Sequence, residues 1–259
     1  VIFQPAEEGG AGGDAMVKDG MMDRFGIQEV YGLHNMPHLP VGHFYLRPGP
    51  LLAASDTFAI EIEGHGAHAS RPHLSIDPVA VGCQIHAAMQ TIVARNVDPL
   101  KSAVVSVTQF HAGEANNVIP QTATLKGTVR TLEDGVRSLV QKRIQEICDG
   151  LAATHGAKIS LKYNRGYPVT ENHPQQTEFA AQVARGVSGD DAVRTDVPPL
   201  MGGEDFSFML KSRPGAFIFM GIGDTKGGLH HPAYDFNDEA IPAGISFWGR
   251  LVETAMPAA

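Results

Sequence analysis

The clearest structural pattern in the chain lies at residues 57–63, which read Thr57-Phe58-Ala59-Ile60-Glu61-Ile62-Glu63. In an extended chain, successive side chains point to opposite faces, so the three apolar residues at positions 58, 60 and 62 share one face. The residues between them share the other face. The pattern predicts an antiparallel strand with one buried face and one solvated face.

The residues that follow extend this strand into a small domain. Asp77-Pro78 has the composition of a helix N-cap followed by a first-turn proline, and predicts a helix. The apolar residues expected on one face of this helix are Val81, Ile85, Ala88, Met89, Ile92 and Val93. Further patterns predict strands at 103–110, 122–131 and 158–163 and a helix at 133–154. The order βαββαβ is that of the ferredoxin-like split unit, so we predict an inserted ferredoxin-like domain at residues 55–167.

The flanking segments, 1–54 and 168–259, predict a larger α/β domain. Strands are expected at 1–3, 29–34 and 216–220, and helices at 14–22, 176–187 and 238–254. This alternation is typical of a mostly parallel sheet. The first residues resemble a strand entered in its middle, without an initiator Met, so we expect that the sequence is N-terminally incomplete.

Composition excludes several classes of protein. The chain has 20 Lys+Arg against 28 Asp+Glu and no basic run, which argues against a nucleic-acid partner. No apolar stretch approaches the roughly 18 residues that span a bilayer, so no membrane partner is expected. Its two cysteines, Cys83 and Cys148, form no disulfide framework, and no secretory signal is evident, so we predict a cytoplasmic protein.

Adjacent carboxylates follow the first predicted strand, in the segment Gln4-Pro5-Ala6-Glu7-Glu8-Gly9-Gly10. Ligands of open α/β sheets bind beyond the carboxyl ends of the strands, where this loop is expected to lie. Adjacent acids repel one another, so a buried pair requires a cation or a proton. An exposed acidic loop without a ligand accounts for the same residues equally well.

Two histidines are expected near this loop. His34 ends a predicted strand, and His230 lies in the loop Leu229-His230-His231-Pro232. With Glu8 they provide the oxygen and nitrogen donors that zinc, manganese or cobalt accepts. The alternatives stay open: a strand-end histidine bonded to a carbonyl, and a histidine in a surface loop.

The inserted domain contains a second polar group, His68, Asn117 and Arg130. A histidine, an amide and a guanidinium are able to stabilise an oxyanion and hold a carboxylate. Turn formation by the asparagine and a surface ion pair of the arginine are the structural alternatives. The chain lacks the Gly-x-Ser-x-Gly nucleophile elbow and the Walker loop, and the glycines at 9–13 lack the dinucleotide-binding spacing.

Seven short motifs occur together in one order. They read Gln-Pro-Ala-Glu-Glu-Gly-Gly, Gly-Leu-His-Asn-Met-Pro, Gly-Ala-His-Ala-Ser-Arg-Pro-His, Asn-Val-Ile-Pro, Gly-Thr-Val-Arg, Gly-Gly-Glu-Asp-Phe and Leu-His-His-Pro. This set closely resembles the M20 metallopeptidase/amidohydrolase family, in the branch of N-acyl-amino-acid, hippurate and plant auxin-conjugate hydrolases. The resemblance extends through the whole chain.

The resemblance implies a catalytic α/β domain with two divalent metal ions (Zn, Mn or Co) and an inserted lid domain that forms a homodimer. It implies that Glu7 is the general base and acid and that Glu8, His34 and His230 are metal ligands. It further implies that His68 stabilises the oxyanion in the site of a neighbouring subunit. The residues that it places at the substrate are Asn117, Arg130 and Gly203, with Glu204 in the same pocket loop.

One departure from the family concerns the metal site. The family's His-x-Asp and Cys-Gly-His-Asp motifs, which supply further metal ligands, do not occur in this chain. We predict metal-dependent hydrolysis of the amide bond of N-acyl amino acids or small peptides such as dipeptides. A non-catalytic dimerising fragment without a complete metal site is the alternative, and a regulatory binder of amino acids is a third reading.

Overall fold

The computed structural model describes residues 1–257, which divide into two compact units. Of these residues, unit 1 comprises 1–52, 170–200 and 204–257, and unit 2 comprises 53–169 and 201–203. The functional domain boundaries expected at 54/55 and 167/168 stay a prediction. Within residues 1–257, no helix is both long enough and apolar enough to cross a membrane.

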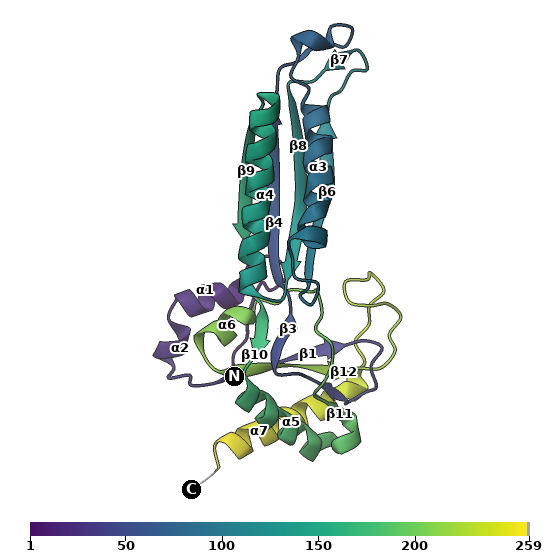
Figure 1. Cartoon of the computed structure of the whole chain (residues 1–259). Helices are drawn as coiled ribbons and strands as arrows, with labels where there is room; N and C mark the ends of the chain where they lie inside the picture. The colour runs from purple at the N-terminus through teal and green to yellow at the C-terminus, as the bar shows by residue number, and fades with distance from the viewer. Residues whose placement is uncertain (258–259) are drawn as a thin grey trace. The chain divides into compact units, whose positions relative to one another are not determined.

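Unit 2 is built on a four-stranded antiparallel sheet in the order β6-β8-β4-β9 (Figure 1). Its elements are β4 (Ala54–Glu63), β5 (Ala67–His68), η1 (Pro72–Leu74), α3 (Pro78–Arg95), β6 (Ala103–Ala112), β7 (Val118–Ile119), β8 (Thr122–Thr131), α4 (Asp134–His155) and β9 (Lys158–Arg165). The strands and helices predicted over residues 57–163 are therefore confirmed, in the predicted order. The short strands β5 and β7 pair with each other in a separate ribbon.

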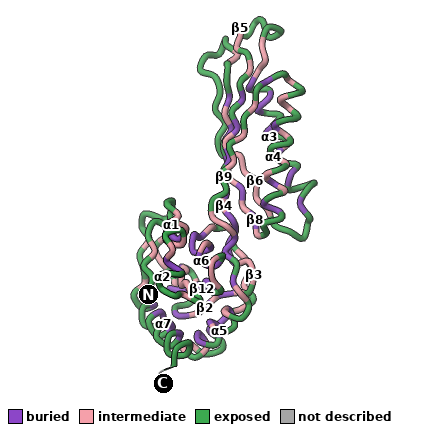
Figure 2. Tube along the Cα trace, turned by 90° about the vertical axis from the view of Figure 1, so that its left-hand side faces the viewer, coloured by how far each residue is buried: buried purple, intermediate pink, exposed green. Residues whose placement is uncertain are grey.

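The alternation along β4 places every second side chain in the core of unit 2. Phe58, Ile60 and Ile62 are buried, whereas Glu61 and Glu63 are exposed. The helices α3 and α4 cover the buried face of the sheet (Figure 2). The predicted face of α3 is buried at Val81, Ile85, Met89 and Ile92, but Val93 is exposed. The carboxylate of Asp77 accepts hydrogen bonds from the backbone at the start of α3, as expected of an N-cap.

A buried ion pair lies at one end of this core. Asp56 accepts two hydrogen bonds from Nε of Arg137, at 3.0 and 3.1 Å, and both side chains are at least 94% buried. The Tyr163 hydroxyl and the Gly166 backbone N–H also donate to the Asp56 carboxylate, at 2.8 and 3.1 Å. The carboxylate is thus fully surrounded by donors, which makes its burial tolerable.

Unit 1 contains a four-stranded mixed sheet in the order β1-β12-β2-β11 (Figure 1). Its elements are α1 (Gly12–Lys18), α2 (Met21–Arg24), β1 (Val30–Met36), β2 (Phe44–Tyr45), β3 (Gly49–Leu52), β10 (Thr170–Asn172), α5 (Pro174–Ser188), η2 (Asp190–Ala192), β11 (Val193–Arg194), α6 (Ser207–Ser212), β12 (Gly215–Gly221), η3 (Asp238–Ala240) and α7 (Ile241–Ala255). The predicted α/β class is confirmed. The strands β3 and β10 form a separate antiparallel pair.

The sheet of unit 1 is less parallel than the sequence predicted. The pairs β1–β12 and β2–β11 are parallel, but β12 and β2 run antiparallel. The link between β1 and β2, residues 37–43, is too short for the crossover of a dozen or more residues that parallel strands require. The chain therefore returns in the opposite direction.

Both faces of this sheet are covered, and the central strand β12 is buried along its whole length. Ala216, Ile218 and Met220 pack on one side with residues of α5 and α7. Phe217 and Phe219 pack on the other side with residues of α2 and α6. A strand buried on both faces shows a continuous apolar run without alternation, which is how this strand was recognised in the sequence.

Two local predictions in unit 1 are wrong. Residues 1–3 form no strand, and Val1 and Phe3 are exposed, because no described strand provides hydrogen-bond partners for them. The single helix predicted over residues 14–22 is two short helices. Gly20 separates them with a φ of 80°, a left-handed conformation that interrupts helical geometry and favours glycine.

Candidate metal and active site

The loop that carries Glu7 and Glu8 connects the start of the chain to α1. It turns sharply, with Gly10 donating its backbone N–H to the carbonyl of Ala6 at 2.9 Å. Both Ala6 and Ala11 have positive φ angles, 56° and 49°. Such backbone conformations are strained for residues with a Cβ and are concentrated at functional sites.

A second acidic loop packs on this one. The Asp205 carboxylate accepts the backbone N–H of Gly13 at 2.8 Å and a side-chain hydrogen bond from Gln4. Gly13 is required at this contact, because a Cβ there would lie 2.8 Å from the backbone oxygen of Asp205. Burial raises the pKa of Asp205, while the donors Gly13 and Gln4 act in the opposite direction.

Glu204 is the most perturbed acid of this region. It is 7% exposed, and its Oε1 accepts the backbone N–H of Phe206 at 3.0 Å. Its pKa is raised to about 7, mainly by burial and also by the negative charges of Glu7 and Asp205, against the lowering effect of the Phe206 hydrogen bond. A carboxylate in this environment is stabilised by a proton or by a cation.

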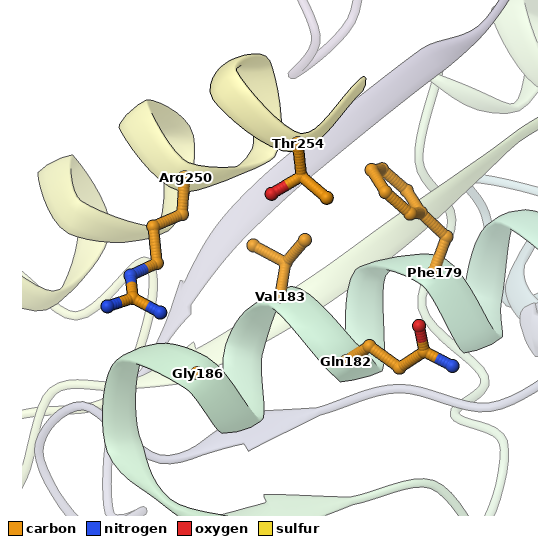
Figure 3. Close-up of a pocket in the computed structure, with 6 residues that line it drawn as sticks. All are labelled: Phe179, Gln182, Val183, Gly186, Arg250 and Thr254. Carbon is orange, nitrogen blue, oxygen red and sulfur yellow. The ribbon is translucent and has the colours of Figure 1, made fainter. Parts of the chain in front are cut away.

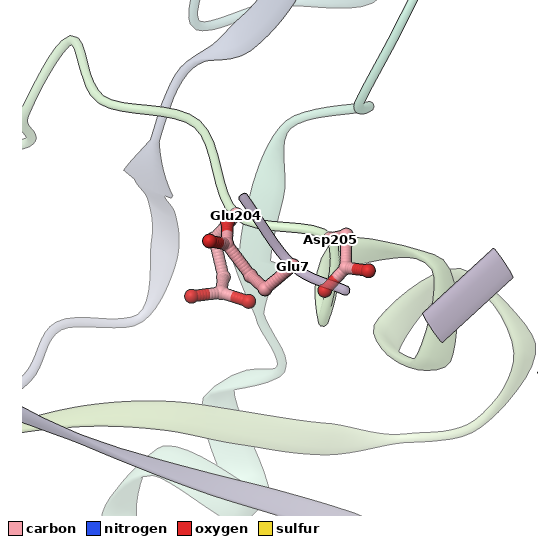
Figure 4. Close-up of side chains that lie close together, drawn as sticks. All are labelled: Glu7, Glu204 and Asp205. Carbon is pink, nitrogen blue, oxygen red and sulfur yellow. The ribbon is translucent and has the colours of Figure 1, made fainter. Parts of the chain in front are cut away.

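Glu7 completes the group. One carboxylate oxygen from each of Glu7, Glu204 and Asp205 lies within 4.8 Å of the others (Figure 4). Burial raises the pKa of Glu7, followed by the charges of Glu8 and Asp205, whereas His230 lowers it. Three converging acids form the kind of donor set that holds a divalent cation.

The predicted ligands lie partly beside this group. Nδ1 of His230 is 3.7 Å from Oε2 of Glu8, and both side chains are largely exposed. Nδ1 of His34 is 2.6 Å from the backbone oxygen of Asn35. The contact at 3.7 Å thus brings two of the three predicted ligands, Glu8 and His230, next to each other.

The hydrogen bond of the His34 ring leaves its other nitrogen free to bind a metal ion. A backbone carbonyl only accepts, so the Nδ1 contact with Asn35 requires the proton on Nδ1 and leaves a lone pair on Nε2. Metal-binding histidines are commonly held this way. The same contact also matches the open alternative, a strand-end histidine that is satisfied by a carbonyl.

The predicted substrate residues of unit 2 lie at its two ends. His68 is in β5, opposite Val118 of β7, and the carbonyl of the neighbouring Asn117 accepts the backbone N–H of Ala69 at 2.9 Å. Arg130 lies near the other end of β8. Since a strand advances about 3.3 Å per residue, roughly 25 Å of β8 separates Arg130 from the β5–β7 ribbon.

Arg130 is half-buried and bonded to neutral groups. Its guanidinium donates to the Thr128 hydroxyl and, at 3.1 Å, to the carbonyl of Val129. Burial lowers its pKa, against the opposing charge of Asp56. Gly203 lies at the same end of unit 2, where an added Cβ would meet the Ser55 side chain at 3.0 Å, and Ser55 pairs with Arg130 across the sheet.

Sequence reasoning missed the acidic pair of the second loop as members of the site. Glu204 was associated only with the pocket loop, and Asp205 received no role. The available signal was the motif Gly-Gly-Glu-Asp-Phe, in which two adjacent acids follow two glycines that permit close packing.

A hollow between α5 and α7 is a weaker candidate for a binding site. It is lined by Phe179, Gln182, Val183, Gly186, Arg250 and Thr254 (Figure 3). Its volume of about 140 Å³ is below the roughly 300–1,000 Å³ of small-molecule sites. It contains no carboxylate or histidine, so the acidic group at Glu7 is the candidate that we pursue.

Comparison with known proteins gives a consistent family assignment. The sequence profile of "Peptidase family M20/M25/M40" matches residues 1–254. The chain is similar to a hippurate hydrolase of Campylobacter jejuni, with 39% identity over 251 residues that cover 97% of this chain and 65% of the relative. It is 41% identical to an N-acetyl-L-cysteine deacetylase of Bacillus subtilis over 241 residues, 93% of this chain and 56% of the relative.

Solved structures agree. A structure described as a putative aminohydrolase from methicillin resistant Staphylococcus aureus superposes with a TM-score of 0.87 and 31% identity, over 96% of this chain and 64% of that one. The Bacillus subtilis YXEP protein, described as a dinuclear metal binding peptidase from the M20 family, gives a TM-score of 0.82 and 31% identity. The superposition covers 99% of this chain and 65% of that one. The chain thus spans less than two thirds of the length of these relatives.

Proposed function

The chain belongs to the peptidase family M20/M25/M40, and from this premise we propose that it acts in the metal-dependent hydrolysis of the amide bond of N-acyl amino acids or small peptides. The family resemblance predicted from the motifs is confirmed. The observation that carries the proposal is the convergence of Glu7, Glu204 and Asp205 within 4.8 Å, with Glu8 next to Glu7 in the chain and His230 3.7 Å from Glu8.

The residues present fit a divalent metal site. Burial raises the pKa of all three acids, and Glu204 and Asp205 are both buried. Their negative charges are costly without a cation and are stabilised by one. We propose that Glu8, His34 and His230 act as ligands for zinc, manganese or cobalt, with Glu204 supplying a further oxygen. Two such ions would polarise the scissile carbonyl and promote the ionisation of water.

Glu7 is the proposed proton carrier. A general base works best when its pKa lies near the working pH, and burial together with Glu8 and Asp205 shifts the pKa of Glu7 upward from its ordinary value. Its carboxylate would take a proton from the attacking water and deliver it to the amine nitrogen of the leaving amino acid. This role requires only one carboxylate oxygen that does not bind metal.

The substrate would be held by residues of unit 2. We propose that Arg130, whose guanidinium donates to the neutral groups of Thr128 and Val129, binds the free carboxylate of the amino acid, beside Gly203. His68 and Asn117 would act at the oxyanion. Because roughly 25 Å of β8 separates these residues from Arg130, they cannot reach the same small substrate within one chain.

This separation supports a homodimer in which the second subunit supplies His68 and Asn117. We propose that unit 2, with its βαββαβ order, is a ferredoxin-like lid and dimerisation domain. A cytoplasmic location is also proposed, supported by the two free cysteines, since reducing compartments keep thiols free. The non-catalytic fragment is not favoured, because the similar proteins are named as hydrolases and the acids of the site are present.

The test combines metal content with hydrolysis. The purified protein is loaded with Zn, Mn or Co and incubated with N-benzoylglycine and N-acetylcysteine, and the released amine is measured. We expect bound metal and hydrolysis in the parent protein, and in Glu7→Gln bound metal with turnover lower by about 10²-fold or more. Glu253→Gln, an exposed position on α7, is the matched control. A metal-loaded parent that releases no amine would refute the proposal.

A further inference from the structure

The loop at the end of unit 2 holds His68 on a fixed backbone. Backbone hydrogen bonds join His65 and Ile76 in both directions, at 2.9 and 3.1 Å, and so close the loop at its base. The Gln121 side chain bonds to Gly64 and Gly66 at 2.8 and 2.9 Å. Together with the β5–β7 pairing, these contacts determine where the His68 ring can lie.

The ring itself is held by one neighbour. Nδ1 of His68 lies 3.1 Å from the backbone nitrogen of Ser70 and 2.8 Å from its hydroxyl. A backbone N–H can only donate, so Nδ1 must carry a lone pair. In a neutral imidazole the proton then resides on Nε2. The Arg71 N–H bond to the His68 carbonyl, 2.8 Å, closes the turn that brings Ser70 back to the ring.

We infer that Ser70 is a positioning residue, which locks His68 in the Nε2–H tautomer so that the ring presents a hydrogen-bond donor and no lone pair at Nε2. The use of this donor at an oxyanion rests on the function proposed above; the tautomer does not. His34 provides the contrast, because its contact with the Asn35 carbonyl fixes the opposite tautomer. The chain thereby prepares one histidine as a donor and another as a ligand.

The tautomers are measured directly by long-range ¹H–¹⁵N correlation NMR on the ¹⁵N-labelled, metal-free chain at about pH 8.5, above the ordinary pKa of histidine. His68→Gln identifies the His68 signals. We expect Nε2–H for His68 and Nδ1–H for His34. His231, whose Nδ1 accepts the Ala233 backbone N–H at 3.0 Å, is an internal reference for the Nε2–H form.

Variants test the part played by the serine. Ser70→Ala keeps the backbone donor and removes the hydroxyl, so we expect a smaller Nε2–H population and a kcat lower by about fivefold with KM unchanged. Ser70→Thr should restore both. Ser75→Ala is the matched control, since the Ser75 hydroxyl lies in the same loop but bonds to the Pro72 carbonyl at 2.7 Å.

The outcomes separate the two proposals. Nδ1–H on His68 in the parent chain, or an equal response to Ser70→Ala and Ser75→Ala, would overturn the inference. Nε2–H on His68 in a metal-loaded protein that hydrolyses no N-acyl amino acid would support the inference and refute the proposed function.

Discussion

Replacing Glu204 by Gln in the metal-free protein tests the electrostatics of the acidic group. Glu204 is 7% exposed, and burial raises its pKa to about 7. Its Oε1 accepts the Phe206 backbone N–H at 3.0 Å, which the amide oxygen of glutamine can also accept. The substitution therefore keeps the shape and this hydrogen bond while it removes the charge.

The sign of the effect follows from proton binding. The folded protein retains a proton on Glu204 at pH values where the unfolded chain, with an ordinary pKa of 4.5, has lost it. The protonated Glu204 side chain thus makes its full contribution to the free energy of unfolding below about pH 4.5. This contribution falls as pH rises toward 7, by about 1.4 kcal/mol per pH unit. We expect the free energy of unfolding of Glu204→Gln to exceed that of the parent by about 3 kcal/mol at pH 8 and to equal it near pH 4.5.

The assay is urea unfolding in the presence of a chelator, followed by tryptophan fluorescence. Trp248 is the one tryptophan of the chain and lies in α7 of unit 1, the unit that contains Glu204. The signal therefore reports on the relevant unit. Glu253→Gln, which removes an exposed charge from the same helix as the tryptophan, is the control and should follow the parent at both pH values.

Two results would refute this reasoning. If Glu204→Gln is no more stable than the parent at pH 8, the carboxylate does not carry a costly charge in the folded protein. If the free energy of unfolding of the variant exceeds that of the parent by the same amount at pH 4.5 as at pH 8, the effect has a cause other than ionisation of Glu204.

Three further predictions concern other parts of the chain. Asp56→Ala leaves the buried Arg137 guanidinium without its carboxylate and should lower the unfolding free energy by about 3–5 kcal/mol, measured by circular dichroism, whereas Asp56→Asn should cost less. Gly13→Ala places a Cβ 2.8 Å from a backbone oxygen of the second acidic loop and should weaken metal binding about tenfold or more in a titration, with the fold retained. Cys83 is exposed, but burial raises the pKa of Cys148 to about 12, so a disulfide reagent at pH 8 should modify one thiol quickly and the second only after urea is added.

The sequence predicted unit 2 well because its signals are local. The alternation at 57–63 is a direct record of which residues face the core, and Asp77-Pro78 marks a helix start within two residues. Neither signal depends on a distant part of the chain. The whole βαββαβ order could therefore be predicted without knowing how the strands pair.

The same reasoning failed where the structure of a segment depends on the strand with which it pairs. An apolar run at residues 1–3 has strand propensity, but propensity supplies no hydrogen-bond partner, and the segment is exposed. The two-residue strand at Phe44–Tyr45 is too short to show any period, although it reverses the direction of pairing in the sheet. A mixed sheet was consequently predicted as a mostly parallel one.

The candidate site shows a similar division. Motifs identified Glu7, Glu8 and His230 one at a time, and the structure places them in adjoining loops. The proximity of Glu204 to Glu7 could not be predicted, because it joins positions almost 200 residues apart and depends on the packing of Gly13 against Asp205. A pattern in sequence records what a residue is suited to bind but does not record which other residues share its pocket.

Stability and metal binding are coupled at this acidic group, and in opposite directions. The charges on Glu7, Glu204 and Asp205 destabilise the metal-free fold as pH rises, because each is partly desolvated and each is repelled by neighbouring carboxylates. A bound divalent ion removes that repulsion, and it competes with protons for the same oxygens. Metal affinity must therefore increase over the pH range in which the metal-free protein loses stability. An acidic group retained only for folding would be more stable as amides, so the cost of these charges is itself an argument that they serve to bind a cation.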